Sequence, residues 1–169
     1  KTYSSQLKNS TAAISYLKER NITGETAKIF DLGYAENNFQ MLINKFSGTY
    51  SEIDLLNAGL IVKKDSNTYD KFRDRVMFPI HDASGNTIAF GGRIIRESQL
   101  AKYINSPETE FYKKGRTVFN LDKAKALRSE TNEAIIVEGY MDVVSLYAAG
   151  IKNTISNSGT ALTDMQIEL

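Results

Sequence analysis

The sequence contains no cysteine and only one histidine, His81, in 169 residues. Without cysteine the chain can form neither a disulfide bond nor a thiolate zinc site, and a single histidine cannot build a histidine metal cluster. Any metal ion that this chain binds must therefore lie on carboxylate oxygens. Oxygen ligands favour Mg²⁺ or Mn²⁺.

The sequence also lacks long hydrophobic runs. No run approaches the roughly 18 consecutive apolar residues of a membrane-spanning helix, and the first residues, KTYSSQLKNS, lack the apolar stretch of a signal peptide. We therefore expect a cytoplasmic protein with no membrane contact. Apolar residues make up 41% of the chain and charged residues 24%, which excludes a disordered or fibrous protein. The length suits one hydrophobic core or two small ones.

Charge is distributed unevenly along the chain, although the formal net charge is only +1. Between Ile61 and Arg128 there are 14 Lys and Arg against 8 Asp and Glu, which leaves 7 against 12 in the remainder. The middle of the chain is therefore basic. Such segregation suggests a polyanion partner, whereas the ordinary alternative is a solvated charged surface.

The first 60 residues carry the patterns of short helices. Apolar residues recur at helical spacing in STAAISYLKERN (10–21), which begins at a Ser/Thr cap, and in ENNFQMLINKF (36–46). A third segment, SEIDLLNAG (51–59), runs from a serine to a glycine stop. We predict short helices that pack together.

From Tyr69 the pattern changes to strands. RVMFPI (75–80) and TIAFGGRII (87–95) flank the turn residues HDASGN (81–86), so we predict a β-hairpin. The stretch that follows, residues 96–120, is polar and has few regular repeats. We expect it to form a loop-rich surface.

Helix and strand patterns alternate from Leu121 onward. In chain order they are LDKAKALRSE (121–130), EAIIVEG (133–139), YMDVVSLYAAG (140–150), KNTISNSG (152–159) and TDMQIEL (163–169). The first strand is continuously apolar, as strands covered on both faces are, and a β-α-β-α order predicts a parallel sheet. We therefore divide the chain into a basic α+β part, residues 1–130, and the start of an α/β part, residues 131–169.

Glu138 and Asp142 lie where the first of these strands meets its helix. Ligands of open parallel sheets bind at the carboxyl ends of the strands, so both carboxylates are candidates for a site. The alternative is that Asp142 complements the helix dipole and Glu138 is a solvated strand end. The spacing alone leaves both possibilities open.

Five motifs occur together and in one order: YDKFRDRVMFPIHD (69–82), GNTIAFGGRII (85–95), KYINSPET (102–109), KKGRTVFNL (113–121) and IIVEGYMDVVSLYAAGI (135–151). From about Tyr16 to Leu169 they closely resemble the catalytic core of bacterial replicative primases of the DnaG type. The resemblance implies that the strand-Glu-Gly turn opens a Toprim domain, the metal-binding fold shared with topoisomerases and certain nucleases. The expected fold is an α+β subdomain followed by the first β-α-β-α of a truncated, Rossmann-like α/β Toprim domain.

The resemblance implies an activity as well, namely synthesis of RNA primers on single-stranded DNA from ribonucleoside triphosphates. Glu138 and Asp142 would then be catalytic residues that hold Mg²⁺ or Mn²⁺. Further ligands would come from an Asp-x-Asp motif beyond this chain, so the isolated fragment should be inactive. The resemblance also implies a zinc domain and contacts with the replicative helicase and the single-stranded DNA-binding protein, all through absent regions, and a place at the bacterial nucleoid.

The basic middle of the chain matches a groove for template and nucleotide phosphates. By resemblance its residues are Arg73, Arg75, Arg93, Lys102, Asn105, Lys114 and Arg116. Alternate basic residues on strands and a Lys-Gly-Arg loop can follow a phosphate backbone. The alternative is that some of these residues only pair with acidic neighbours.

Four further features remain open. Tyr103, Phe111 and Tyr112 could stack on bases or anchor loops, and Tyr140 could lie over the acidic turn or pack its helix. The NSGT at 157–160 departs from the Ser-Leu-Gly-Thr usual in the family.

A different function also remains possible, a single-stranded DNA-binding module with a topoisomerase- or nuclease-like Toprim domain, because fold does not fix chemistry.

Overall fold

The computed structural model describes residues 1–96, 99–159 and 161–169. Glu97 and Ser98, in the stretch predicted to be loop-rich, and Thr160, in the NSGT turn, lie outside the described residues. Among the described residues no helix is long and apolar enough to cross a membrane.

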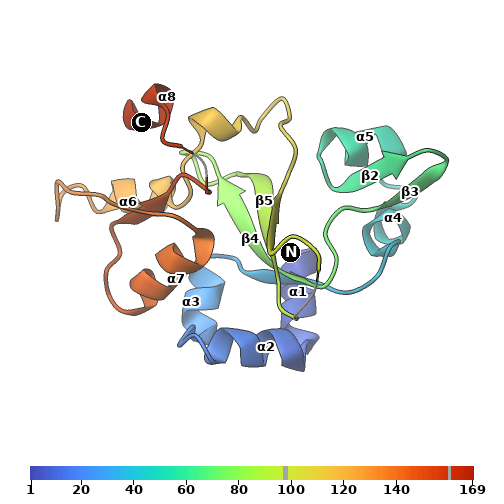
Figure 1. Ribbon diagram of the computed structural model, residues 1–169, viewed down its shortest axis with the longest axis horizontal. Helices are drawn as coiled ribbons and strands as arrows, with labels where there is room; N and C mark the ends of the chain where they lie inside the picture. The colour runs from blue at the N-terminus through green and yellow to red at the C-terminus, as the bar shows by residue number, and fades with distance from the viewer. Residues whose placement is uncertain (97–98, 160) are drawn as a thin grey trace.

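Three short helices begin the chain, in blue at the bottom of Figure 1. They are α1 (Thr2–Asn9), α2 (Thr11–Lys18) and α3 (Gly24–Ile29). The hydroxyl of Ser10 accepts the N–H of Ala13 at 3.2 Å, which confirms the predicted cap of α2. Because such a cap satisfies a backbone donor that the first turn of a helix leaves free, it fixes where α2 begins.

A four-stranded antiparallel sheet of order β1-β4-β5-β6 lies at the centre of the molecule (Figure 1). Its strands are β1 (Gly33–Ala35), β4 (Arg75–His81), β5 (Thr87–Ile94) and β6 (Tyr103–Asn105). The hairpin β4–β5 is the predicted one, and the carboxylate of Asp82 fixes its turn by accepting the N–H groups of Ser84 and Asn86, both at 2.9 Å. The two outer strands were not predicted.

A smaller unit lies to the right in Figure 1. It contains α4 (Met41–Phe46), α5 (Glu52–Asn57) and the hairpin of β2 (Ile61–Lys64) with β3 (Asn67–Asp70). Both helices were predicted. The carboxylate of Asp70 is fully buried and accepts the N–H groups of Leu42 at 2.7 Å and Ile43 at 3.4 Å, so β3 caps the start of α4.

The C-terminal third has the predicted β-α-β-α order. Its elements are the 3₁₀ turn η1 (Lys114–Arg116), α6 (Leu121–Ala126), β7 (Ile135–Val137), α7 (Tyr140–Ala148), β8 (Thr154–Ser156) and α8 (Asp164–Ile167). Strands β7 and β8 pair in parallel, with Ile135 opposite Thr154. The parallel sheet inferred from the sequence is confirmed for this pair.

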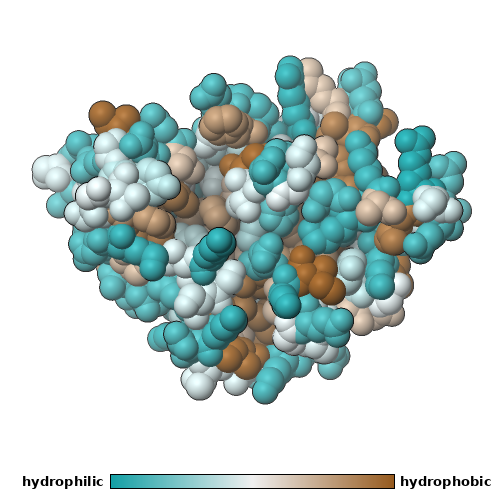
Figure 2. Space-filling view, turned by 180° about the vertical axis from the view of Figure 1, so that it is seen from behind, coloured by the Kyte–Doolittle hydropathy of each residue, from teal (hydrophilic) through white to brown (hydrophobic). Residues whose placement is uncertain are grey.

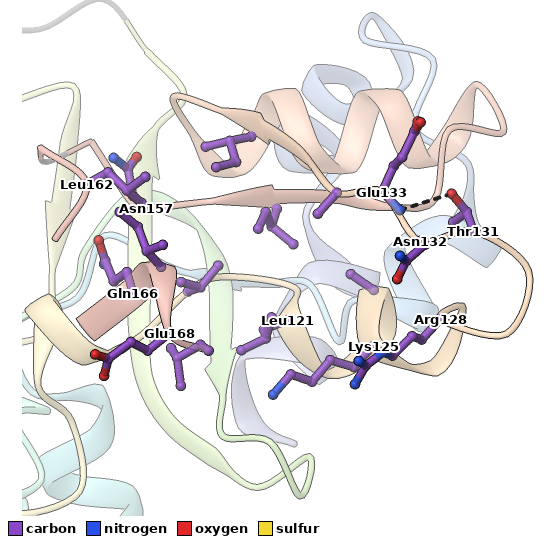
Figure 3. Close-up of a pocket in the computed structure, with 17 residues that line it drawn as sticks. Leu121, Lys125, Arg128, Thr131, Asn132, Glu133, Asn157, Leu162, Gln166 and Glu168 are labelled. Carbon is purple, nitrogen blue, oxygen red and sulfur yellow. Dashed lines mark hydrogen bonds between the residues drawn. The ribbon is translucent and has the colours of Figure 1, made fainter. Parts of the chain in front are cut away.

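The burial predicted for β7 is wrong. Ile135 is 42% exposed and Ile136 is 52% exposed, whereas a continuously apolar strand was expected to be covered on both faces. On one face of the strand pair a pocket of about 800 Å³ opens between α6, β7, β8 and α8, and Ile136 and Ile155 line it. Figure 3 shows this pocket, with Leu121, Leu162 and Gln166 among the residues around it. The described chain therefore leaves this face of the strand pair unfilled.

One hydrophobic cluster joins the two parts of the chain. It contains Val76 and Phe78 of β4, Leu17 of α2, and Val143 and Val144 of α7. The rear surface, in contrast, is largely hydrophilic, with exposed apolar residues in small separate groups (Figure 2). Helix α7 is thus held against the central sheet by burial of apolar surface.

The contact between α1 and β1 gives a first testable prediction. A Cβ atom on Gly33 would lie 2.4 Å from the Cβ and 2.7 Å from the carbonyl carbon of Tyr3. Gly33→Ala should therefore lower the free energy of unfolding by about 1–3 kcal/mol, because the rigid backbone of α1 would have to move. Urea denaturation of the chain measures this, with Gly24→Ala, where nothing lies within 4 Å, as the control. Equal stability of the two variants would contradict the close packing.

Candidate nucleic-acid and metal site

The two predicted acidic residues flank the turn between β7 and α7. Strand β7 ends at Val137 and α7 begins at Tyr140, so Glu138 directly follows the strand, and Asp142 lies in the first helical turn. Both side chains are exposed. The N–H of Gly139 donates to Oδ2 of Asp142 at 3.0 Å, so Asp142 caps its own helix. The carboxylate of Glu138 has no hydrogen bond or ion pair with any described residue.

This turn offers two exposed carboxylates, the kind of ligand that Mg²⁺ and Mn²⁺ prefer. Mg²⁺ in proteins commonly binds one or two carboxylates and completes its octahedron with water and substrate phosphates. Glu138 and Asp142 provide such a pair. Across residues 1–96, 99–159 and 161–169 no group of three or more acidic or histidine side chains is arranged to hold a metal. The donor set therefore suits one ion and is too small for two.

Tyr140 fastens the acidic turn to the central sheet. Its side chain is 2% exposed and stacks on Phe78, with ring centroids 5.4 Å apart and an interplanar angle of 18°. Its hydroxyl donates to Oδ1 of Asn105 in β6 at 2.8 Å. Burial raises the pKa of Tyr140, so the phenol stays neutral and keeps its proton. Of the two placements left open for Tyr140, the packed one is found.

Arg93 and Lys102 come together in a basic pocket of about 480 Å³ beside the sheet. The guanidinium of Arg93 donates to the hydroxyl of Tyr103 at 2.6 Å and lies 5.0 Å from the centre of that ring. Burial is the main factor that raises the pKa of Tyr103; the hydrogen bond from Arg93 opposes it, and the charge of Asp142 adds to it.

Two further arginines line the same pocket and were missed by sequence reasoning. Arg20 follows the end of α2 and lies 3.7 Å from the ring centre of Tyr16, while Arg96 follows β5 and pairs with Asp74 at 3.3 Å. Arg20 is far from Arg93 in the sequence, and a basic residue at a helix C-terminus has an ordinary explanation in the helix dipole. Only the tertiary fold reveals its place in the pocket.

Arg73 and Arg75 make their contacts within the fold of the chain. Arg75 is 4% exposed and donates to the carbonyl oxygens of Gly92 and Lys102, both at 3.3 Å; burial lowers its pKa. Arg73 donates to the carbonyl oxygen of Asp70, and its guanidinium lies 4.3 Å from the ring centre of Phe39. Neither residue lines the basic pocket.

Lys114 and Arg116 form a separate basic group in η1, against α8. The N–H of Lys114 donates to Oε1 of Glu108 at 3.0 Å, and its carbonyl oxygen accepts from Gln166 at 3.0 Å. Nε of Arg116 lies 3.0 Å from Sδ of Met165. These contacts fix the backbone of the loop and leave the ammonium of Lys114 without an ion pair among the described residues.

The three aromatic residues near this charge divide between the two roles left open. Tyr112 is 1% exposed and anchors its loop, whereas Phe111 is 75% exposed. Tyr103 is half-buried under Arg93. Phe111 is thus a fully available stacking surface, and Tyr103 a partly available one.

Comparison with known protein families assigns both parts of the chain. The family model described as the N-terminal domain of the DNA primase catalytic core matches residues 2–125, and that of the Toprim domain matches residues 132–169. The chain is 41% identical to the DNA primase of Legionella pneumophila and 43% identical to that of Clostridium acetobutylicum, over 99% and 96% of its length. It spans only 29% and 27% of those relatives.

Solved structures are similar throughout the chain. A DnaG primase catalytic domain bound to single-stranded DNA matches with a TM-score of 0.90 and 38% identity, over 99% of this chain and 55% of that one. The E. coli primase catalytic core matches with a TM-score of 0.91 and 38% identity, over 99% and 54%.

Proposed function

Because the chain belongs to the family of bacterial DnaG-type DNA primases, we propose that it is the part of a primase that binds the single-stranded template. We propose that it also contributes two carboxylates to the metal site for RNA primer synthesis. The observation that carries the proposal is the hydrogen bond from Tyr140 to Asn105. This hydrogen bond holds the turn that carries Glu138 and Asp142 beside β6. Lys102, which immediately precedes β6, lines the basic pocket. Template and nucleotide phosphates would then lie next to the carboxylates that handle the metal.

The proposed roles follow from the chemistry of each group. Arg20, Arg93, Arg96 and Lys102 line the basic pocket and would bind phosphates, with Asn105 adding uncharged amide donors beside them. Lys114 and Arg116 would contact the strand further along, and Arg73 and Arg75 would support these surfaces from within the fold.

Glu138 would be the main protein ligand for Mg²⁺ or Mn²⁺, because its carboxylate has no other partner in the described chain. Asp142 would add its free oxygen while its other oxygen holds the turn. When bound, the metal supplies charge neutralisation on the triphosphate and activation of the attacking hydroxyl. The protein residues contribute position: the capped turn fixes α7, and the buried phenol fixes α7 to the sheet.

The competing function, a DNA-nicking module of the topoisomerase kind, needs a tyrosine nucleophile near the acidic turn. Tyr140 adjoins that turn, but it is 2% exposed, its pKa is raised by burial, and its hydroxyl is bonded to Asn105. A buried, neutral phenol is a poor nucleophile. This residue therefore favours primer synthesis over DNA nicking.

The remaining partners in this proposal are ribonucleoside triphosphates, the replicative helicase and the single-stranded DNA-binding protein, the last two through other regions of the primase. Zinc would likewise belong to another domain, since this chain has no cysteine. The proposed location is the bacterial cytoplasm, at the nucleoid, where the template lies.

The salt dependence of the affinity for single-stranded DNA tests the proposed DNA binding. Replacing Lys102 or Lys114 by Ala should weaken binding of single-stranded oligonucleotides about equally for all sequences, and should flatten the slope of log affinity against log salt by about 0.7 for each lost phosphate contact. Fluorescence anisotropy of the chain with labelled oligonucleotides measures this. Lys64→Ala, an exposed lysine on β2, is the matched control. Slopes that stay at the wild-type value would show that both lysines are ordinary surface charges.

A further inference from the structure

The phenol of Tyr140 occupies a fixed position between three parts of the chain. Tyr140 begins α7, its hydroxyl donates to Asn105 of β6, and its ring stacks on Phe78 of β4. The ring itself fits over Gly91 of β5, where a Cβ atom would lie 2.3 Å from the ring. A side chain that is enclosed on this many sides cannot change rotamer without opening the core.

The fixed phenol determines how the amide of Asn105 is used. Oδ1 of Asn105 accepts a hydrogen bond from the phenolic O–H at 2.8 Å. An asparagine amide has one acceptor oxygen and two N–H donors on its nitrogen. Because Oδ1 is bonded to the phenol, the Nδ2 amino group points away from Tyr140. No hydrogen bond joins this amino group to any described residue.

Asn105 lies between the basic pocket and the acidic turn. It ends β6, whose first residue is Tyr103, the partner of Arg93, and Lys102 immediately precedes this strand. Its amide is half-buried, so it can meet a ligand that passes along β6. An uncharged donor next to a basic pocket suits a phosphate oxygen or a base edge of a single strand.

We propose that Tyr140 is a positioning residue for nucleic-acid binding: its hydroxyl orients Asn105 so that the amide donors face the single strand. This role rests on the proposed function, because it assumes that β6 contacts DNA.

A double-mutant cycle on binding tests the proposal. Tyr140→Phe deletes only the hydroxyl, and Asn105→Ala deletes the amide. Each should weaken binding of a labelled single-stranded oligonucleotide by about three- to tenfold, as expected for one uncharged hydrogen bond. The double variant should be no weaker than Asn105→Ala alone, because the hydroxyl acts through the amide. The slope of log affinity against log salt should stay at its wild-type value, since no charge is removed.

Tyr147→Phe is the matched control. It removes a hydroxyl from the same helix, at a ring that packs edge-on against Phe30 with centroids 5.0 Å apart, and it should bind DNA as the wild type does. Melting temperatures of all variants establish that they are folded in the assay. Should Tyr140→Phe fail to fold, Asn105→Asp replaces it: a carboxylate keeps an acceptor for the phenol and loses the amide donors, so binding should be weakened at least as much as in Asn105→Ala.

The outcomes separate the two proposals. A wild-type chain that does not bind single-stranded DNA would overturn the proposed function, and the positioning role with it. Wild-type binding together with an unaffected Tyr140→Phe, or losses that multiply in the double variant, would overturn the positioning role alone. A purely structural hydroxyl would lower the melting temperature and leave the affinity of the folded protein unchanged.

Discussion

Glu138→Gln should reduce primer synthesis by the protein that contains this chain by about a hundredfold or more, with little change in melting temperature. Glutamine keeps the shape of the side chain and removes the charge that attracts the metal, so the loss falls on the chemical step. Glu138 is exposed and has no partner among the described residues, so the fold has no contact to lose. RNA products from a single-stranded template, separated on a gel, measure the activity.

Glu133→Gln is the control for this experiment. Glu133 is an exposed glutamate just before the same strand, and the described contacts of Glu133 use its backbone, in hydrogen bonds with Thr131 and Asn153. The Glu133→Gln variant should therefore retain wild-type activity. A near-normal primer yield from Glu138→Gln would remove this carboxylate from the active site and leave it as the solvated strand end that the sequence also allowed.

Elements with strong local patterns were predictable from the sequence. The hairpin β4–β5 has its turn chemistry at Asp82 and Asn86, and the β-α-β-α order of the C-terminal part has alternating helix and strand patterns. Strands β1 and β6 contain three residues each, too few for an alternating pattern to stand out. They exist because they pair with the edges of the hairpin, which is a tertiary effect.

The candidate site could be predicted only where it depends on local sequence. Glu138 and Asp142 are four residues apart and flank one strand–helix junction, which the strand and helix patterns mark. The basic pocket combines α2 with β5 and the segment before β6, and nothing in the sequence near Arg20 points to it. Arg75 shows the opposite case, because a basic residue expected to bind phosphates is buried, and its guanidinium donates to two backbone carbonyl oxygens. Neither arrangement follows from residue type and spacing.

The chain by itself should bind single-stranded DNA and synthesise no primers. In the proposed function, binding depends on the basic pocket and on η1, so phosphate contacts should give micromolar or weaker affinity at physiological salt. Synthesis needs a metal held firmly enough to align a triphosphate with a hydroxyl. Glu138 and Asp142 provide two carboxylates, one oxygen of which already caps α7, and the described chain offers no larger group of metal-binding side chains.

Binding and chemistry should therefore separate in one experiment. The chain is incubated with single-stranded template, ribonucleoside triphosphates and Mg²⁺ or Mn²⁺, DNA binding is followed by anisotropy, and products are separated on a gel. A longer primase that continues beyond Leu169 serves as the positive control. Template-dependent RNA from the chain alone would mean that two carboxylates, water and substrate phosphates complete a working metal site. DNA binding without RNA product would support the proposal that two carboxylates are too few to hold the metal for primer synthesis.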